Sequence, residues 1–109
     1  MPFRGISVTE FGVPTVLTVN NSIPALVPGA KQVVVKMRAA GVNPVDTYIR
    51  AGTYAKLPTL PYTPGNDGAG FVEAIGEEVS NVKVGDRVYI TRSVSGTYAE
   101  KSLCDSSQV

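Results

Sequence analysis

The sequence contains no histidine and no tryptophan, and its only cysteine is Cys104. Without histidine there can be no histidine-ligated zinc, no catalytic triad built on histidine and no imidazole acid or base. A single thiol excludes disulfides within the chain and metal sites that need several thiolates, and it is typical of a reducing compartment. With no histidine to activate it, Cys104 is expected to be buried and inert rather than a nucleophile.

Charge and long apolar runs are also scarce. Ten Lys and Arg stand against nine Asp and Glu, and charged residues make up only 17% of the chain. A net charge of +1 gives no electrostatic case for a nucleic acid or an anionic membrane as partner. The apolar runs are too short to span a bilayer, and the opening M-P-F-R-G lacks the apolar core of a secretory signal. The chain therefore has the features of a cytoplasmic protein.

The length of 109 residues predicts one domain over 1–109. Gly and Pro divide this domain into short segments rich in β-branched and aromatic residues, as in strands. The expected strands at the N-terminal end are 3–8 and 16–19, which would form a hairpin, and then 31–40. Asn20-Asn21-Ser22 is expected to be a turn, and Ile23 and Leu26 to lie in a loop.

One short helix is expected after the strand 31–40. Asn43 suits its N-cap, Pro44 its first position, and Gly52 its end. Residues 53–70 are rich in Pro and Gly and should be irregular. Further strands are expected at 69–75, at 87–91 and from Thr97 onward. Many short strands with one or two short helices, and no regular alternation of the two, indicate a mostly β fold, a small antiparallel β-barrel.

The first candidate site is the segment G-V-N-P-V-D-T-Y-I-R-A-G-T-Y, residues 41–54. Asn43, Tyr48 and Tyr54 could form a polar cluster for a ligand that bears a carbonyl group. The structural alternative makes Asn43 only a helix cap. Asp46 and Arg50, four residues apart, would then form a surface ion pair.

Two glycine-containing segments invite a functional interpretation but favour a structural one. Gly65, Gly68 and Gly70 give G-x-x-G-x-G, the reverse of a dinucleotide-binding spacing, and no helix is expected to follow it. This segment is expected to be a loop that needs positive φ angles and feeds a strand. In 93–98, Gly96 suits a bulge or a strand entry and Tyr98 a core or barrel-rim position.

These motifs occur together, in one order, in a known family. The segment 41–54, then L-P-Y-T-P-G-N-D-G-A-G, V-G-D-R-V-Y and G-T-Y-A-E, resemble the N-terminal part of NADPH-dependent quinone oxidoreductases of the zeta-crystallin type. These enzymes belong to the medium-chain dehydrogenase/reductase superfamily. The resemblance implies a GroES-like β-barrel. It also implies the zinc-free branch, because Asn43 stands where zinc-dependent relatives have a cysteine ligand and Asn66 stands at the position of their histidine ligand.

The resemblance further implies hydride transfer from NADPH to a quinone or another conjugated carbonyl. Asn43 and Tyr54 would line the quinone pocket as catalytic residues, Tyr48 would contact NADPH, and no metal would be needed. Asp46 matches no functional position and keeps its expected pairing with Arg50. Family chains are about three times as long, are homo-oligomeric and bind most of the cofactor on a Rossmann domain.

The 109 residues would then be the substrate-side, GroES-like domain alone, with little or no turnover by themselves. Two other hypotheses stay open. One is a non-enzymatic barrel that acts as an interaction module, with an exposed apolar face for a partner. The other is a co-chaperonin that resembles GroES itself, which would share only the fold.

Overall fold

The structure is a computed structural model, and it describes residues 2–109. Its strands are β1 (Phe3–Ser7), β2 (Thr18–Ile23), β3 (Gln32–Ala40), β4 (Gly68–Ile75), β5 (Arg87–Ile90) and β6 (Lys101–Asp105). The helices are the α-helix α1 (Pro44–Ala51) and two 3-10 turns, η1 (Pro14–Val16) and η2 (Ser106–Gln108). None of these helices combines the length and the hydrophobicity needed to cross a membrane.

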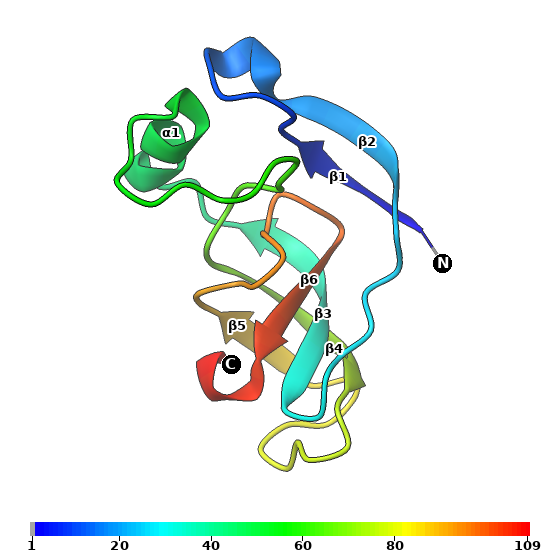
Figure 1. Cartoon of the computed structure of the whole chain (residues 1–109). Helices are drawn as coiled ribbons and strands as arrows, with labels where there is room; N and C mark the ends of the chain where they lie inside the picture. The colour runs from blue at the N-terminus through cyan, green and yellow to red at the C-terminus, as the bar shows by residue number, and fades with distance from the viewer. Residues whose placement is uncertain (1) are drawn as a thin grey trace.

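The strands form two antiparallel sheets, as predicted for a mostly β fold. β1 pairs with β2, and the larger sheet has the order β5-β4-β3-β6. Figure 1 shows the β1–β2 hairpin and α1 at one end of the elongated molecule and the four-stranded sheet at the other. Two isolated bridges, Gly5 to Ala99 and Val8 to Tyr62, connect β1 and the residue that follows it to later segments of the chain.

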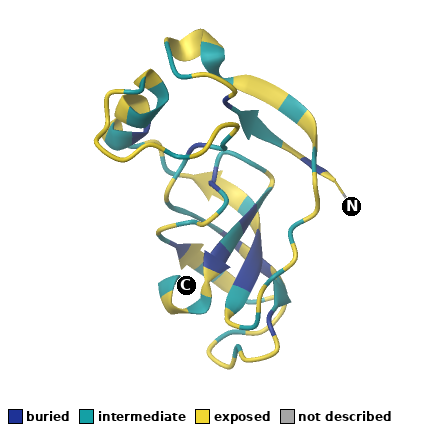
Figure 2. Ribbon diagram, viewed as in Figure 1, coloured by how far each residue is buried: buried dark blue, intermediate teal, exposed yellow. Residues whose placement is uncertain are grey.

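The core lies on the inner face of the larger sheet. Its buried side chains are contributed by β3, β4, β5 and β6: Val33, Val35, Val72, Ile90 and Cys104. Figure 2 shows the buried residues gathered there, whereas α1 and the hairpin carry mostly half-buried and exposed ones. The strand β3 has apolar residues on both faces, since Val34 is as fully buried as its two neighbours.

The first predicted hairpin is confirmed, but β2 starts and ends later than expected. It includes Asn20, Asn21, Ser22 and Ile23, for which the sequence indicated a turn and a loop. The pairing explains the difference: Ile23 lies opposite Phe3 and Asn20 opposite Gly5, with a register shift between them. The Asn20 side chain satisfies a backbone donor of the same strand, because its Oδ1 accepts from the Ser22 N–H at 2.9 Å.

The last strand begins at Lys101, four residues after the predicted start at Thr97. The backbone N–H groups of Thr97 and Tyr98 both donate to the Pro64 carbonyl at 3.0 Å. The Ile6 N–H donates to the Tyr98 carbonyl at 2.8 Å and the Glu100 N–H to the Arg4 carbonyl at 2.9 Å. Residues 97–100 therefore pair mainly with β1 and with the irregular segment before β4. Their one backbone hydrogen bond to β3 among the described residues is from the Met37 N–H to the Glu100 carbonyl, at 2.7 Å.

Candidate functional site

The helix α1 begins and ends where local sequence chemistry predicted. Asn43 is its N-cap in extended backbone, Pro44 occupies the first turn, and Gly52 ends it with φ of 80°. Only glycine adopts that left-handed conformation without strain. Tyr54 comes two residues after Gly52, so the position of Tyr54 depends on where α1 ends.

Asp67, the residue before β4, holds the N-terminal end of α1 in place. The Asn43 carboxamide donates from Nδ2 to Asp67 Oδ1 at 3.1 Å, and the Gly41 N–H donates to the Asp67 carbonyl at 2.9 Å. This carboxylate therefore sets which way the Asn43 amide faces. An amide nitrogen carries two hydrogens, so one N–H of Asn43 stays available to another acceptor.

The predicted ion pair between Asp46 and Arg50 is wrong. Asp46 is buried, with 7% of its surface exposed, and its Oδ2 accepts from the Asn43 N–H at 2.9 Å and from the Tyr98 hydroxyl at 2.9 Å. Arg50 instead donates from Nε to the Gly12 carbonyl at 3.2 Å. The helical spacing is right, but Asp46 faces inward, and a buried carboxylate takes the donors that face it.

Two tyrosines lie around this buried carboxylate. Burial, together with the hydrogen bond to Asp46 and its charge, raises the pKa of Tyr98 to about 12. Burial and the charge of Asp46 also raise the pKa of Tyr62, against a smaller opposing effect of Arg50. The Tyr62 hydroxyl is buried and has no hydrogen-bond partner among the described residues. Both phenols are therefore protonated donors at neutral pH.

A groove with a volume of about 880 Å³ lies beside this cluster. That volume is within the range of small-molecule sites. Four segments enclose it: the β1–β2 hairpin, α1, the irregular residues 54–66 and the turn 93–96. Its apolar lining residues are Ile23, Pro24, Val45, Ile49, Leu57, Pro58, Pro61, Pro64 and Val94, and its aromatic ones are Tyr54 and Tyr62.

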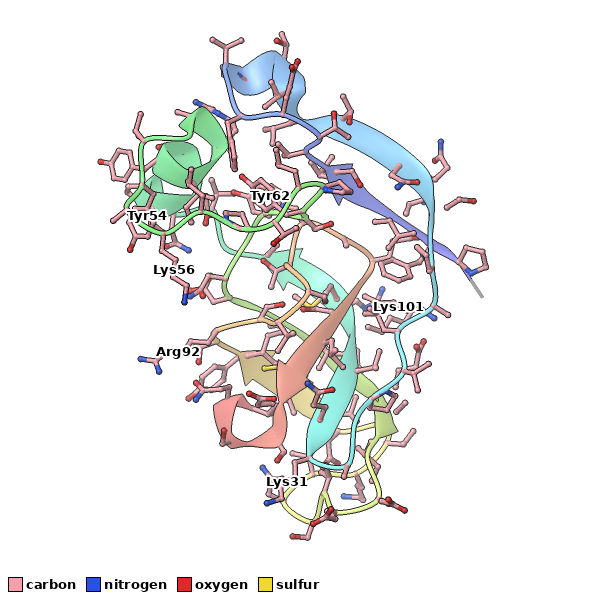
Figure 3. All side chains as sticks on the ribbon, viewed as in Figure 1. Lys31, Tyr54, Lys56, Tyr62, Arg92 and Lys101 are labelled. Carbon is pink, nitrogen blue, oxygen red and sulfur yellow. The ribbon has the colours of Figure 1, made fainter. Side chains whose placement is uncertain are left out.

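The predicted site residues occupy different places around this groove. Tyr54 lines it with 45% of its surface exposed, whereas Tyr48 is 53% exposed and does not line it. Asn43 does not line it either, but its backbone is hydrogen-bonded to the lining residue Asp46. In Figure 3, Tyr54 lies just below α1, and Tyr62 lies further inward, between α1 and β1.

Sequence reasoning missed Tyr62, Tyr98, Asp67 and Lys56 as parts of this region. The partners Tyr98 and Asp46 are 52 residues apart in the chain, so no local spacing could reveal their contact. Tyr62 and Lys56 lie in the stretch correctly predicted to be irregular. Such a stretch carries no periodicity that would indicate which side chains point into a groove.

Cys104 is buried, as predicted. Burial raises the pKa of its thiol to about 11, with a further contribution from Asp105. The glycine-rich loop also matches its structural interpretation, since Gly65 has φ of 103° and the loop leads into β4. Within residues 2–109, no group of three or more His, Cys, Asp or Glu side chains is placed to hold a metal ion.

Comparison with known proteins assigns this arrangement to a family. The family described as alcohol dehydrogenase GroES-like domain matches residues 29–109. A quinone oxidoreductase of Lama guanicoe is 56% identical over 100 residues, which cover 92% of this chain and 30% of that protein. The chain thus spans about a third or less of the length of these relatives.

Solved structures give the same result. A quinone oxidoreductase from Pseudomonas syringae pv. tomato DC3000 matches with a TM-score of 0.89 and 40% identity, over 97% of this chain and 32% of that one. The Escherichia coli quinone oxidoreductase complexed with NADPH matches with a TM-score of 0.88 and 34% identity, over 96% and 32%. The chain therefore belongs to the alcohol dehydrogenase GroES-like domain family and is homologous to the N-terminal part of zeta-crystallin-type quinone oxidoreductases.

Proposed function

We propose that this chain is the substrate-side domain of an NADPH-dependent quinone oxidoreductase that works without zinc. The observation that carries the proposal is the groove of about 880 Å³ with an apolar lining and the ring of Tyr54 at its surface. Flat conjugated rings bind best to apolar and aromatic side chains, with a few polar groups to fix their orientation. The relatives named above are quinone oxidoreductases, which supports the same substrate class.

The polar groups near the groove suit an acceptor of hydride rather than acid–base chemistry. Tyr54 can contact the face of a quinone ring and donate from its hydroxyl. Asn43, held by Asp67 at 3.1 Å, keeps one N–H for a carbonyl oxygen. Fixed donors of this kind stabilise the negative charge that develops on a carbonyl oxygen when the ring is reduced. We propose Asn43 and Tyr54 as the residues that contact substrate. Tyr54 lines the groove, whereas Asn43 lies outside the lining, next to Asp46, so the carbonyl that it binds must extend beyond the groove.

We propose that this domain supplies only a small part of the NADPH site. Tyr48 is half exposed on α1 and suits a contact to the nicotinamide end, where bound NADPH would supply the hydride. The G-x-x-G-x-G loop leads into β4 and not into a helix, so it lacks the helix N-terminus that binds a pyrophosphate. We propose that residues 1–109 form one domain of the enzyme and that a dinucleotide-binding domain supplies the rest of the cofactor site.

Titration of the 109-residue chain with NADPH, followed by a quinone-reduction assay, tests this division. We expect neither saturable binding of NADPH nor measurable turnover by the chain alone. Turnover should appear when a dinucleotide-binding domain from a relative is fused to its C-terminal end. In that fusion, Tyr54→Ala should lower activity and Tyr89→Ala, which changes an exposed tyrosine on β5, should not. NADPH-dependent turnover by residues 1–109 alone would contradict the division between the two domains.

A second function, as a non-enzymatic interaction module, is favoured by large apolar and aromatic side chains that are exposed on this domain. Val94, which lines the groove, is 56% exposed, and Val42 and Tyr48 are 75% and 53% exposed. Exposed apolar surface of this kind serves to dock a partner where it is contiguous. In either function the free thiol of Cys104 suits a reducing, cytoplasmic compartment. Sedimentation of the purified chain, together with a quinone titration, separates the two functions. A monomer that binds quinone favours the enzyme, and stable association without quinone binding favours the interaction module.

A further inference from the structure

Two charged side chains line the groove, and they differ in burial and in whether they have a partner within the protein. Asp46 is buried, and its carboxylate accepts hydrogen bonds from Tyr98 and from the Asn43 backbone. Lys56 is exposed, and no carboxylate among residues 2–109 lies within 4.0 Å of its ammonium group. The negative charge is thus already satisfied inside the protein, whereas the positive charge remains open to a ligand.

A second exposed cation precedes one of the groove's lining residues in the chain. Arg92 precedes the lining residue Ser93, is exposed, and forms no ion pair within the described part of the chain. Figure 3 shows Lys56 and Arg92 projecting from the same side of the molecule, with Tyr54 above them. Lys56 is the cation that lines the groove, and Arg92, which does not line it, is next in the chain to a residue that does.

We propose that Lys56 selects quinones that carry an anionic substituent, such as a sulfonate or a carboxylate, on the ring. The inference rests on the proposed function and adds to it a class of substrate. Tyr54 contacts the ring, and the ammonium group two residues later in the chain pairs with the substituent at the groove mouth. Lysine suits this role because its charge is a compact point on a flexible stem, which can follow substituents at different ring positions.

The size of the effect follows from the exposure of Lys56. An ion pair in contact with water contributes little, and its contribution falls as salt rises. We therefore expect the anionic quinone to bind about two- to fivefold more tightly than a neutral quinone of the same ring size at low ionic strength. Half-molar salt should remove most of that difference.

The test measures dissociation constants from ¹⁵N–¹H shift changes of the 109-residue chain with two quinones. The probes are anthraquinone-2-sulfonate and neutral 2-(hydroxymethyl)anthraquinone. Lys56→Gln should weaken binding of the sulfonate about two- to fivefold and leave the neutral quinone unchanged. Lys56→Arg, which keeps the charge, should retain the preference. Lys31→Gln makes the same charge change at the far end of the molecule (Figure 3) and should alter neither constant.

The outcomes separate this inference from the proposed function. If both quinones bind wild type and Lys56→Gln with equal constants, the charge selectivity is wrong and the quinone groove stands. If neither quinone shifts the resonances of Tyr54 and its neighbours, the quinone groove itself is contradicted. The spectrum of each variant also reports whether it folds, and substitution of an exposed lysine should leave the fold intact.

Discussion

Replacing Tyr98 with phenylalanine removes one hydroxyl and leaves the ring in place. That hydroxyl donates to Asp46 Oδ2 at 2.9 Å and connects the turn before β6 to α1. Asp46 has only 7% of its surface exposed, so water cannot fully replace the lost donor. The carboxylate would keep only the Asn43 N–H as a partner on that oxygen.

A hydrogen bond to a charged group contributes about 1.5–3 kcal/mol to stability. Tyr98→Phe should therefore lower the free energy of unfolding by about 1.5–3 kcal/mol, a large share of the margin of a small domain. Urea slopes for small proteins are about 1–3 kcal/mol per molar. The urea midpoint should accordingly fall by about 0.5–3 M with the slope unchanged.

Equilibrium urea unfolding of purified wild type and variant, followed by far-UV circular dichroism, measures this change. Tyr89→Phe is the matched control, because it removes the same atom from a side chain that is 75% exposed. Its effect should stay within about 0.5 kcal/mol. A loss below about 0.5 kcal/mol for Tyr98→Phe, or equal losses for the two variants, would refute the role given to this hydrogen bond.

Three further predictions concern the same cluster and the core. Because the pKa of Tyr98 is raised to about 12, its stabilisation should be complete below pH 10 and be lost as pH rises toward 12. Urea midpoints of wild type should thus fall more steeply over that range than those of Tyr98→Phe. Tyr62→Phe removes a buried hydroxyl that has no partner within residues 2–109 and should be neutral or stabilising in thermal unfolding, whereas a loss above about 1 kcal/mol would show that the hydroxyl has an acceptor. Cys104, buried with a pKa raised to about 11, should react with an aromatic disulfide reagent at pH 8 only on unfolding, and rapid reaction of the native chain would contradict its burial.

The elements that sequence predicted correctly are those set by local chemistry. Asn43, Pro44 and Gly52 each impose a backbone conformation on their own, so the bounds of α1 followed from three residues. The strand β3 lies within the predicted segment 31–40, which the β-branched residues Val33, Val34 and Val35 mark as a strand. No distant contact is needed for either inference.

The errors arose where a distant segment decides the structure. β2 runs through Asn20–Ser22, whose composition is typical of a turn, because Phe3 and Gly5 offer it partners. Asp46 faces Tyr98 from 52 residues away, and helical spacing alone could not tell that inward face from a solvent-exposed one. The groove is harder still to predict, since its four enclosing segments are joined only by tertiary contacts.

The central claim is that the groove beside α1 binds a quinone. A ¹⁵N–¹H titration of the assigned 109-residue chain with a neutral quinone tests it most directly, because it reports where the ligand lies. A quinone bound in the groove should give saturable shifts confined to groove residues such as Tyr54, Ile49 and Val94, with Tyr89 on β5 unaffected. Saturable shifts centred on the outer face of β5, or no shifts up to the solubility limit of the quinone, would contradict it.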